Sequence, residues 1–226
     1  MDQGETGRRP DRELDATIEG CAAAHQRLLA DVDTLTDEDI ARPSALPDWT
    51  IGHVLTHLAR NADSHIRVYE AAARGVPTER YPGGQQGRNA EIETGAARPA
   101  AEQIADVRGT IWRLESAWAA VPADGWELTA TVYGAPEPVV ELPFRRWREV
   151  EVHHADLGRA EFTIDDWSDG YVRRDLGRAE MTWAARRPMG LTALPPAALA
   201  LSPARRLAWL MGRLDVDGLE APGPWM

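Results

Sequence analysis

The sequence contains no lysine, since all 25 basic residues are arginines. This absence excludes Schiff-base chemistry and the phosphate-binding lysine of a P-loop. Cys21 is the single cysteine, which excludes an internal disulfide and a cysteine-based zinc finger. No apolar run approaches the roughly 20 residues of a membrane-spanning helix, and residues 1–12 lack the apolar core of a secretory signal. We therefore predict a cytoplasmic protein without a membrane partner.

Acidic residues outnumber basic ones by 36 to 25, which gives a formal net charge of −11. Such a charge disfavours binding to nucleic acids or to anionic membranes. The 226 residues, of which 43% are hydrophobic, suffice for one large domain or for a main domain with a small appendage. Monomer and homodimer both remain open.

Apolar residues at helical spacing predict four long amphipathic helices. They cover residues 11–34, 51 to at least 68, 99–120 and 142–158. Asp48 or Thr50 is predicted to cap the second of these helices. The Gly- and Pro-rich segment 76–98 is predicted to be a long connection. ELTATVY (127–133) has the composition of a strand, and GAPEP (134–138) is predicted to turn it towards VVEL in a short hairpin. This pattern indicates a mainly α protein built on a four-helix bundle.

Residues 159–226 have a different pattern. A helix is predicted over 166–187, and a Pro-rich turn, a short apolar run (AALAL) and a helix opened by Ser202-Pro203 follow. We therefore predict two domains, a helical bundle over 1–158 and a small C-terminal α or α/β unit over 159–226.

The histidines, together with a nearby glutamate, indicate a possible metal-binding site. Glu149 and His153 are four residues apart, so they lie on one face of their helix, about 40° apart around its axis. A carboxylate and an imidazole presented together can bind a divalent metal if a facing helix supplies a third ligand. His57 lies nearer than His53 to the apolar stripe of the second helix, and is the better candidate. Asn61, one turn beyond His57, is placed to orient a ligand or to bind substrate.

Less specific interpretations stand beside this one. A Glu-x3-His pair on a helix is commonly a surface contact. His53 and His154 fit polar positions on helix faces better than metal ligands. Arg146 and Arg148 would then simply neutralise Glu149, and Cys21 fits a buried packing residue better than a nucleophile.

Two segments together resemble the mycothiol-dependent maleylpyruvate isomerase family, within the DinB-like metal-binding bundles. They are DWTIGHVLTHLARNAD (48–63) and RRWREVEVHHADLG (145–158). RNAEIETG (88–95) is similar to the family's connection between its second and third helices. MGRLDVDG (211–218) resembles its C-terminal Gly-Arg segment, although the C-terminal unit is shorter than the family's usual α/β domain.

The resemblance implies a DinB-like four-helix bundle in which His57, Glu149 and His153 bind Zn²⁺. It also implies that Arg213 takes part in catalysis by holding a substrate carboxylate, and that Asn61 and Asp156 orient metal ligands or substrate. Arg88 and Asn89 are candidate contacts to the thiol cofactor, with solvent-facing loop positions as the alternative.

The implied activity is a zinc- and mycothiol-dependent isomerisation of maleylpyruvate to fumarylpyruvate. It proceeds by thiolate addition, bond rotation and elimination. One alternative is an S-transferase that joins mycothiol, or another low-molecular-weight thiol, to an anionic electrophile. A second is a non-catalytic metal-binding protein on the same bundle, which intact His57, Glu149 and His153 argue against.

Overall fold

The computed structural model describes residues 8–189 and 192–223. These residues form two compact units that divide between Glu161 and Phe162, three residues beyond the boundary expected from the sequence. No helix within the described ranges combines the length and the apolar character that crossing a membrane requires.

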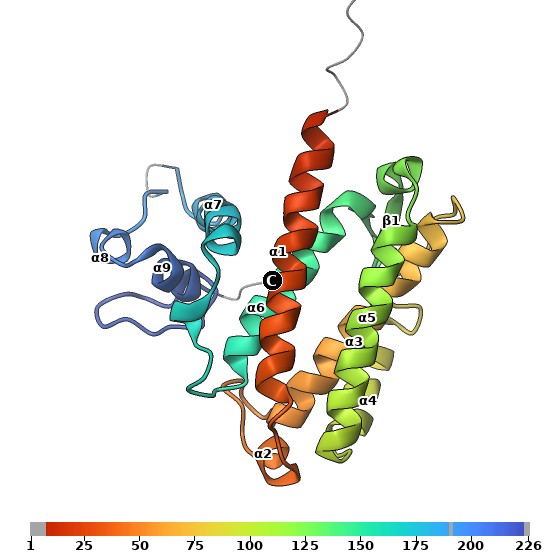
Figure 1. Cartoon of the computed structure of the whole chain (residues 1–226). Coiled ribbons are helices and arrows are strands. Elements are labelled where there is room, and N and C mark those ends of the chain that lie inside the picture. Colours follow the sequence, from red (N-terminus) through yellow and green to blue (C-terminus); the bar gives the residue numbers. More distant parts are fainter. Residues whose placement is uncertain (1–7, 190–191, 224–226) are drawn as a thin grey trace, which may run out of the picture. The chain divides into compact units, whose positions relative to one another are not determined.

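The first unit is the predicted bundle (Figure 1). Its long helices are α1 (Arg8–Val32), α3 (Ile51–Ala72), α5 (Ala100–Ala120) and α6 (Leu142–Asp156). Helix α3 packs against both α5 and α6, and α1 also packs against α5 and α6. The mainly α, bundle-based fold expected from the sequence is therefore confirmed.

The predicted apolar stripe of α3 forms the centre of the core. Every residue in that stripe is buried: Ile51, Val54, Leu55, Leu58, Ala62 and Val68. Thr50, rather than Asp48, caps this helix, because its hydroxyl oxygen accepts from the backbone N–H of His53. Cys21 is also fully buried among core residues, as its place in the stripe of α1 predicts. A short capped helix, α2 (Asp37–Ala41), precedes α3.

Segment 76–98 contains a helix that the sequence pattern did not predict. Helix α4 (Gly84–Ala96) packs on α3 but buries only Ile92, Gly95 and Ala96. Its first residue lacks a side-chain cap and its sequence lacks an apolar stripe, so the periodicity that marks the other helices is absent. Arg88 and Asn89 consequently lie on a helix and not in a loop.

The hairpin exists with a different register from the predicted one. A 3₁₀ turn, η1 (Ala123–Glu127), leads to β1 (Thr129–Val132), which pairs antiparallel with β2 (Ala135–Pro138). APEP therefore forms the second strand instead of the turn, and the following VVE forms the 3₁₀ turn η2 (Val139–Glu141). Prolines are tolerated in β2 because a two-stranded sheet leaves every other backbone N–H without a ladder partner.

All the regular secondary structure among the described residues of the second unit is helical. It contains η3 (Ile164–Asp166), α7 (Asp169–Ala185), α8 (Pro196–Leu199) and α9 (Pro203–Leu210). Its core gathers Trp183, Ala198, Trp209 and Leu210, with the two indole rings 5.0 Å apart. The AALAL run contributes the helical turn α8 rather than a strand, because Pro196 at its first turn favours a helix start and Ala198 then packs into this core. The α alternative, not the α/β one, describes this unit.

Candidate metal centre

Helices α3 and α6 bring three potential metal ligands together. His57 lies in the second turn of α3, and Glu149 and His153 lie one turn apart on α6. One donor atom from each of the three side chains lies within 4.8 Å of the others, and this is the one such group among the described residues. The Nε2–H of His57 donates to Glu149 Oε2 at 2.9 Å, and His153 Nε2 lies 3.5 Å from the same oxygen. The predicted set thus converges in space.

The three side chains carry different charges in this cluster. Burial, with His153 nearby, lowers the pKa of His57 to about 4, so this ring is neutral at physiological pH. Burial opposes ionisation of Glu149, but hydrogen bonds from His153 and His57 outweigh it and hold the pKa of that carboxyl well below its usual range. Burial also opposes the charged form of His153, yet bonds to Asp156 and Glu149 raise its pKa to about 9.

Each histidine has a further partner on the side of the ring away from the cluster. Nδ1 of His153 lies 2.9 Å from Asp156 Oδ2, a carboxylate three residues along α6. This is the contact by which metal-binding histidines are commonly oriented. Nδ1 of His57 instead accepts a hydrogen bond from Arg88 Nη2 at 2.8 Å. Arg88 is therefore brought to the cluster by α4.

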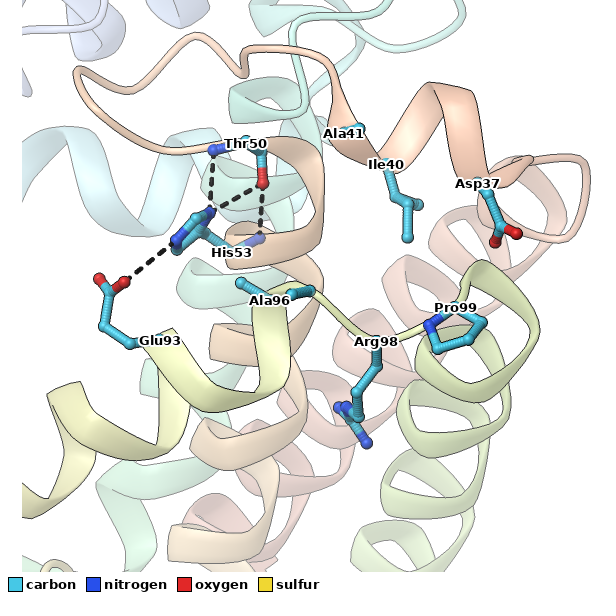
Figure 2. Close-up of a pocket in the computed structure, with 10 residues that line it drawn as sticks. Asp37, Ile40, Ala41, Thr50, His53, Glu93, Ala96, Arg98 and Pro99 are labelled. Carbon is cyan, nitrogen blue, oxygen red and sulfur yellow. Dashed lines mark hydrogen bonds and ion pairs between the residues drawn. The ribbon is translucent and has the colours of Figure 1, made fainter.

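His53 lies outside the cluster, as its helical phase predicts. Its Nδ1 accepts from the backbone N–H of Thr50 at 3.1 Å, and its Nε2 lies 3.5 Å from Glu93 Oε2 (Figure 2). These residues line a separate cavity of about 600 Å³ at the start of α3. The indole of Trp49 contacts both rings, 6.0 Å from His53 and 5.7 Å from His57 between centroids, and so connects the two environments.

The remaining predicted site residues have other surroundings. Asn61 is buried, and its Oδ1 accepts from Arg146 Nη1 at 2.9 Å. Asn89 is exposed and accepts from Arg88 Nη1 at 3.1 Å. Arg213 belongs to the second unit, where it follows α9 and donates to the carbonyl of Met211. Roles for these residues in the reaction stay predictions.

Arg146 does not pair with Glu149 as the sequence suggested, but lies in the core with other partners. It is fully buried, and its guanidinium donates to Leu58 O, Asn61 Oδ1 and His25 Nε2. The periodicity of α6 contained the signal, because Arg146 lies one turn from both Leu142 and Val150 in the buried stripe. It ties α6 to α3 and α1 from within the core.

The donor set fits a divalent metal ion. Two imidazoles and one carboxylate are a combination that binds zinc and leaves a coordination position open. Asp156 supplies the expected support to His153, and the lowered pKa values keep His57 neutral and Glu149 ionised, the charge states that metal binding requires. His153 would have to lose its proton.

Comparisons with known proteins give one family match and two structural matches. Residues 21–158 match the family described as "Mycothiol maleylpyruvate isomerase N-terminal domain". A crystal structure of the mycothiol-dependent maleylpyruvate isomerase superposes with a TM-score of 0.81 at 22% identity, covering 94% of this chain and 97% of that one. A histidine-to-alanine mutant of that isomerase gives a TM-score of 0.80 at 20% identity over the same shares. No curated protein matches the chain in sequence.

The match spans more than half of the chain, including both helices that carry the cluster. The protein therefore belongs to the mycothiol maleylpyruvate isomerase N-terminal domain family. It is an isomerase-like protein whose fold, over nearly its whole length, is that of the crystallised enzyme.

Proposed function

We propose that this protein is a zinc enzyme that isomerises maleylpyruvate to fumarylpyruvate with mycothiol as its thiol cosubstrate. The observation that carries the proposal is the convergence of His57, Glu149 and His153, from two helices of a chain that belongs to this family. Zinc bound by these side chains would lower the pKa of a thiol at the open position, so that it reacts as a thiolate near neutral pH.

The chain's own residues would hold the ligands and the substrate. Asp156 keeps the His153 ring oriented through its Nδ1. Asn61 has its carbonyl oxygen engaged by Arg146, so its amide group is the part that can donate to a substrate oxygen. Arg88 lies next to His57 and offers a guanidinium to an anionic group of the thiol or the electrophile. Arg213 is proposed to bind a substrate carboxylate, which a guanidinium can hold with two hydrogen bonds.

The overall reaction needs no redox partner. The thiol sulfur forms a bond to one carbon of the cis double bond, the resulting single bond rotates, and breaking the carbon–sulfur bond restores the double bond as trans and returns the thiol. Positive side chains around the cluster would stabilise the negative charge that develops on the substrate.

Mass spectrometry of a reaction with zinc-loaded protein, mycothiol and maleylpyruvate tests the proposal. We expect fumarylpyruvate to form only when the thiol is present, with the thiol recovered unchanged. A persistent thiol adduct would identify an S-transferase instead, and the absence of any reaction would refute the assignment.

A pair of variants tests the metal. Glu149→Gln should abolish turnover and stoichiometric zinc binding together, because it removes one of three ligands. Glu93→Gln, on an exposed side chain that contacts His53 instead, is the matched control and should retain both. Activity that survives complete loss of zinc would contradict the proposed role of the metal.

A further inference from the structure

The hairpin turn carries a strained aromatic residue. Tyr133 has φ 48° and Gly134 has φ 82°, so both central residues of this two-residue turn lie in the left-handed region. Turns of this type ordinarily use Asn-Gly or Asp-Gly, since those residues reach positive φ at little cost. A bulky residue there is an outlier, and such outliers concentrate where a side chain is needed for binding or catalysis.

The strain presents the Tyr133 ring to a second tyrosine. Its ring stacks on that of Tyr81 with centroids 5.3 Å apart and planes within 8° of parallel. Tyr133 nevertheless remains 49% exposed. Stacking alone therefore buries only part of the ring, which leaves an aromatic surface open to a ligand.

The position of Tyr81 is fixed by contacts with the buried residue Arg80. The guanidinium of Arg80 lies 5.1 Å from the Tyr81 ring centroid and donates to its hydroxyl oxygen at 3.3 Å. Arg80 is itself buried and pairs with Glu137 of β2 at 3.2 Å. The backbone N–H of Arg80 donates to the carbonyl of Thr131 in β1, which joins the Tyr81 segment to the hairpin. The pair is thus a preorganised surface.

Helix α4 links the tyrosine pair to the metal centre along the chain. Tyr81 precedes the first residue of α4 by three positions, and Arg88 on that helix reaches His57. The charges of Arg88 and Glu149 both act on the Tyr133 hydroxyl, Arg88 lowering its pKa and Glu149 raising it. A ligand attached to the cluster could therefore extend over the two rings.

We infer that Tyr133 and Tyr81 form a binding surface for the sugar and inositol rings of the thiol cosubstrate. The inference rests on the proposed function, because it assigns a place to the part of mycothiol that carries no sulfur. The aromatic faces suit the C–H faces of such rings, and the phenol groups hydrogen-bond to their hydroxyls. The need for this surface explains why the turn keeps a tyrosine where asparagine would be unstrained.

Two substitutions at one position separate strain from binding. Tyr133→Asn keeps the turn and removes the ring, so it should raise Tm by about 2–4 °C as strain is relieved. By calorimetry on the zinc-loaded protein, it should weaken mycothiol binding about tenfold. Binding of N-acetylcysteine, a thiol without the two rings, should not change. Tyr133→Phe should bind mycothiol within about threefold of wild type, because the stacking surface remains.

Trp112→Asn, which removes another exposed aromatic side chain from α5, is the control and should leave both thiols unaffected. Mycothiol affinity that is unchanged in Tyr133→Asn, or equal weakening of both thiols, would overturn the inference. Wild-type protein that binds the two thiols equally would also overturn it, while leaving the isomerase proposal intact. Failure of wild-type protein to bind either thiol would overturn both.

Discussion

Arg88 and Glu149 contact opposite nitrogens of the His57 ring. Arg88 Nη2 donates to Nδ1 at 2.8 Å, and the Nε2–H donates to Glu149 at 2.9 Å. The ring therefore carries its proton on Nε2, the nitrogen inside the cluster. A metal ion at Nε2 requires the lone pair of that nitrogen, so the proton must move to Nδ1. The Nδ1–H and the Arg88 guanidinium would then be two hydrogen-bond donors facing each other. Arg88 and a metal ion thus favour different tautomers of His57.

Removing Arg88 should strengthen metal binding. In Arg88→Met, zinc affinity should rise about tenfold, because no hydrogen bond has to be broken when His57 changes tautomer. Competition with a chromophoric chelator measures this change. The gain should persist at high salt. If Arg88 weakened zinc binding only by repelling the positive ion, salt would screen that repulsion and the gain would disappear. An affinity equal to or below that of wild type would contradict the competition.

Zinc binding should release about one proton near pH 6.5. The raised pKa of His153, about 9, means that this ring keeps its proton below that value in the metal-free protein. His57, with a pKa of about 4, and the ionised Glu149 release none. Metal ligation requires neutral His153, so its proton leaves on binding and zinc affinity rises with pH up to about 9. Titration calorimetry in two buffers of different ionisation enthalpy counts the proton, and a count of zero would contradict the charge assignment.

Asp156→Asn should weaken zinc binding by about 10- to 100-fold, because His153 loses the carboxylate that orients its ring. The neighbouring His154 provides a matched control, since its Nε2 lies 2.9 Å from Asp31 Oδ2. Asp31→Asn changes the same kind of contact on a histidine outside the cluster, and should leave zinc affinity within about twofold of wild type. Equal losses in the two variants would indicate general destabilisation of α6.

Helical phase explains how much of the fold and site was predictable. The stripes on α3 and α6 are continuous, so counting residues around each axis put Glu149 and His153 on one face of α6 and His57 nearer than His53 to the buried face of α3. Helix α4 lacks such a stripe, and its contacts could not be predicted this way. The Arg88–His57 and Tyr81–Tyr133 pairs depend on the path of the chain after α3, which no periodicity encodes.

The hairpin and the second unit illustrate a different limit. Prolines at 136 and 138 favoured a turn by composition, but pairing with β1 accommodates them at the edge of a two-stranded sheet. The AALAL run fits either a strand or a helix by length alone. Ala198 packs against the core around Trp209 when the run is helical, and this contact selects the helix. It joins separate segments of the chain, so local sequence could not predict it.

Replacing the buried arginine should destabilise the bundle. Arg146→Met would leave acceptors on Leu58, Asn61 and His25 without their donor, because each now accepts from this guanidinium. The expected loss in the free energy of unfolding is about 2–4 kcal/mol, measured by urea denaturation. Arg67→Met, on an exposed position of α3, should change it by less than about 0.5 kcal/mol. A loss in Arg146→Met no larger than in this control would mean that hydrophobic packing alone holds α1, α3 and α6 together.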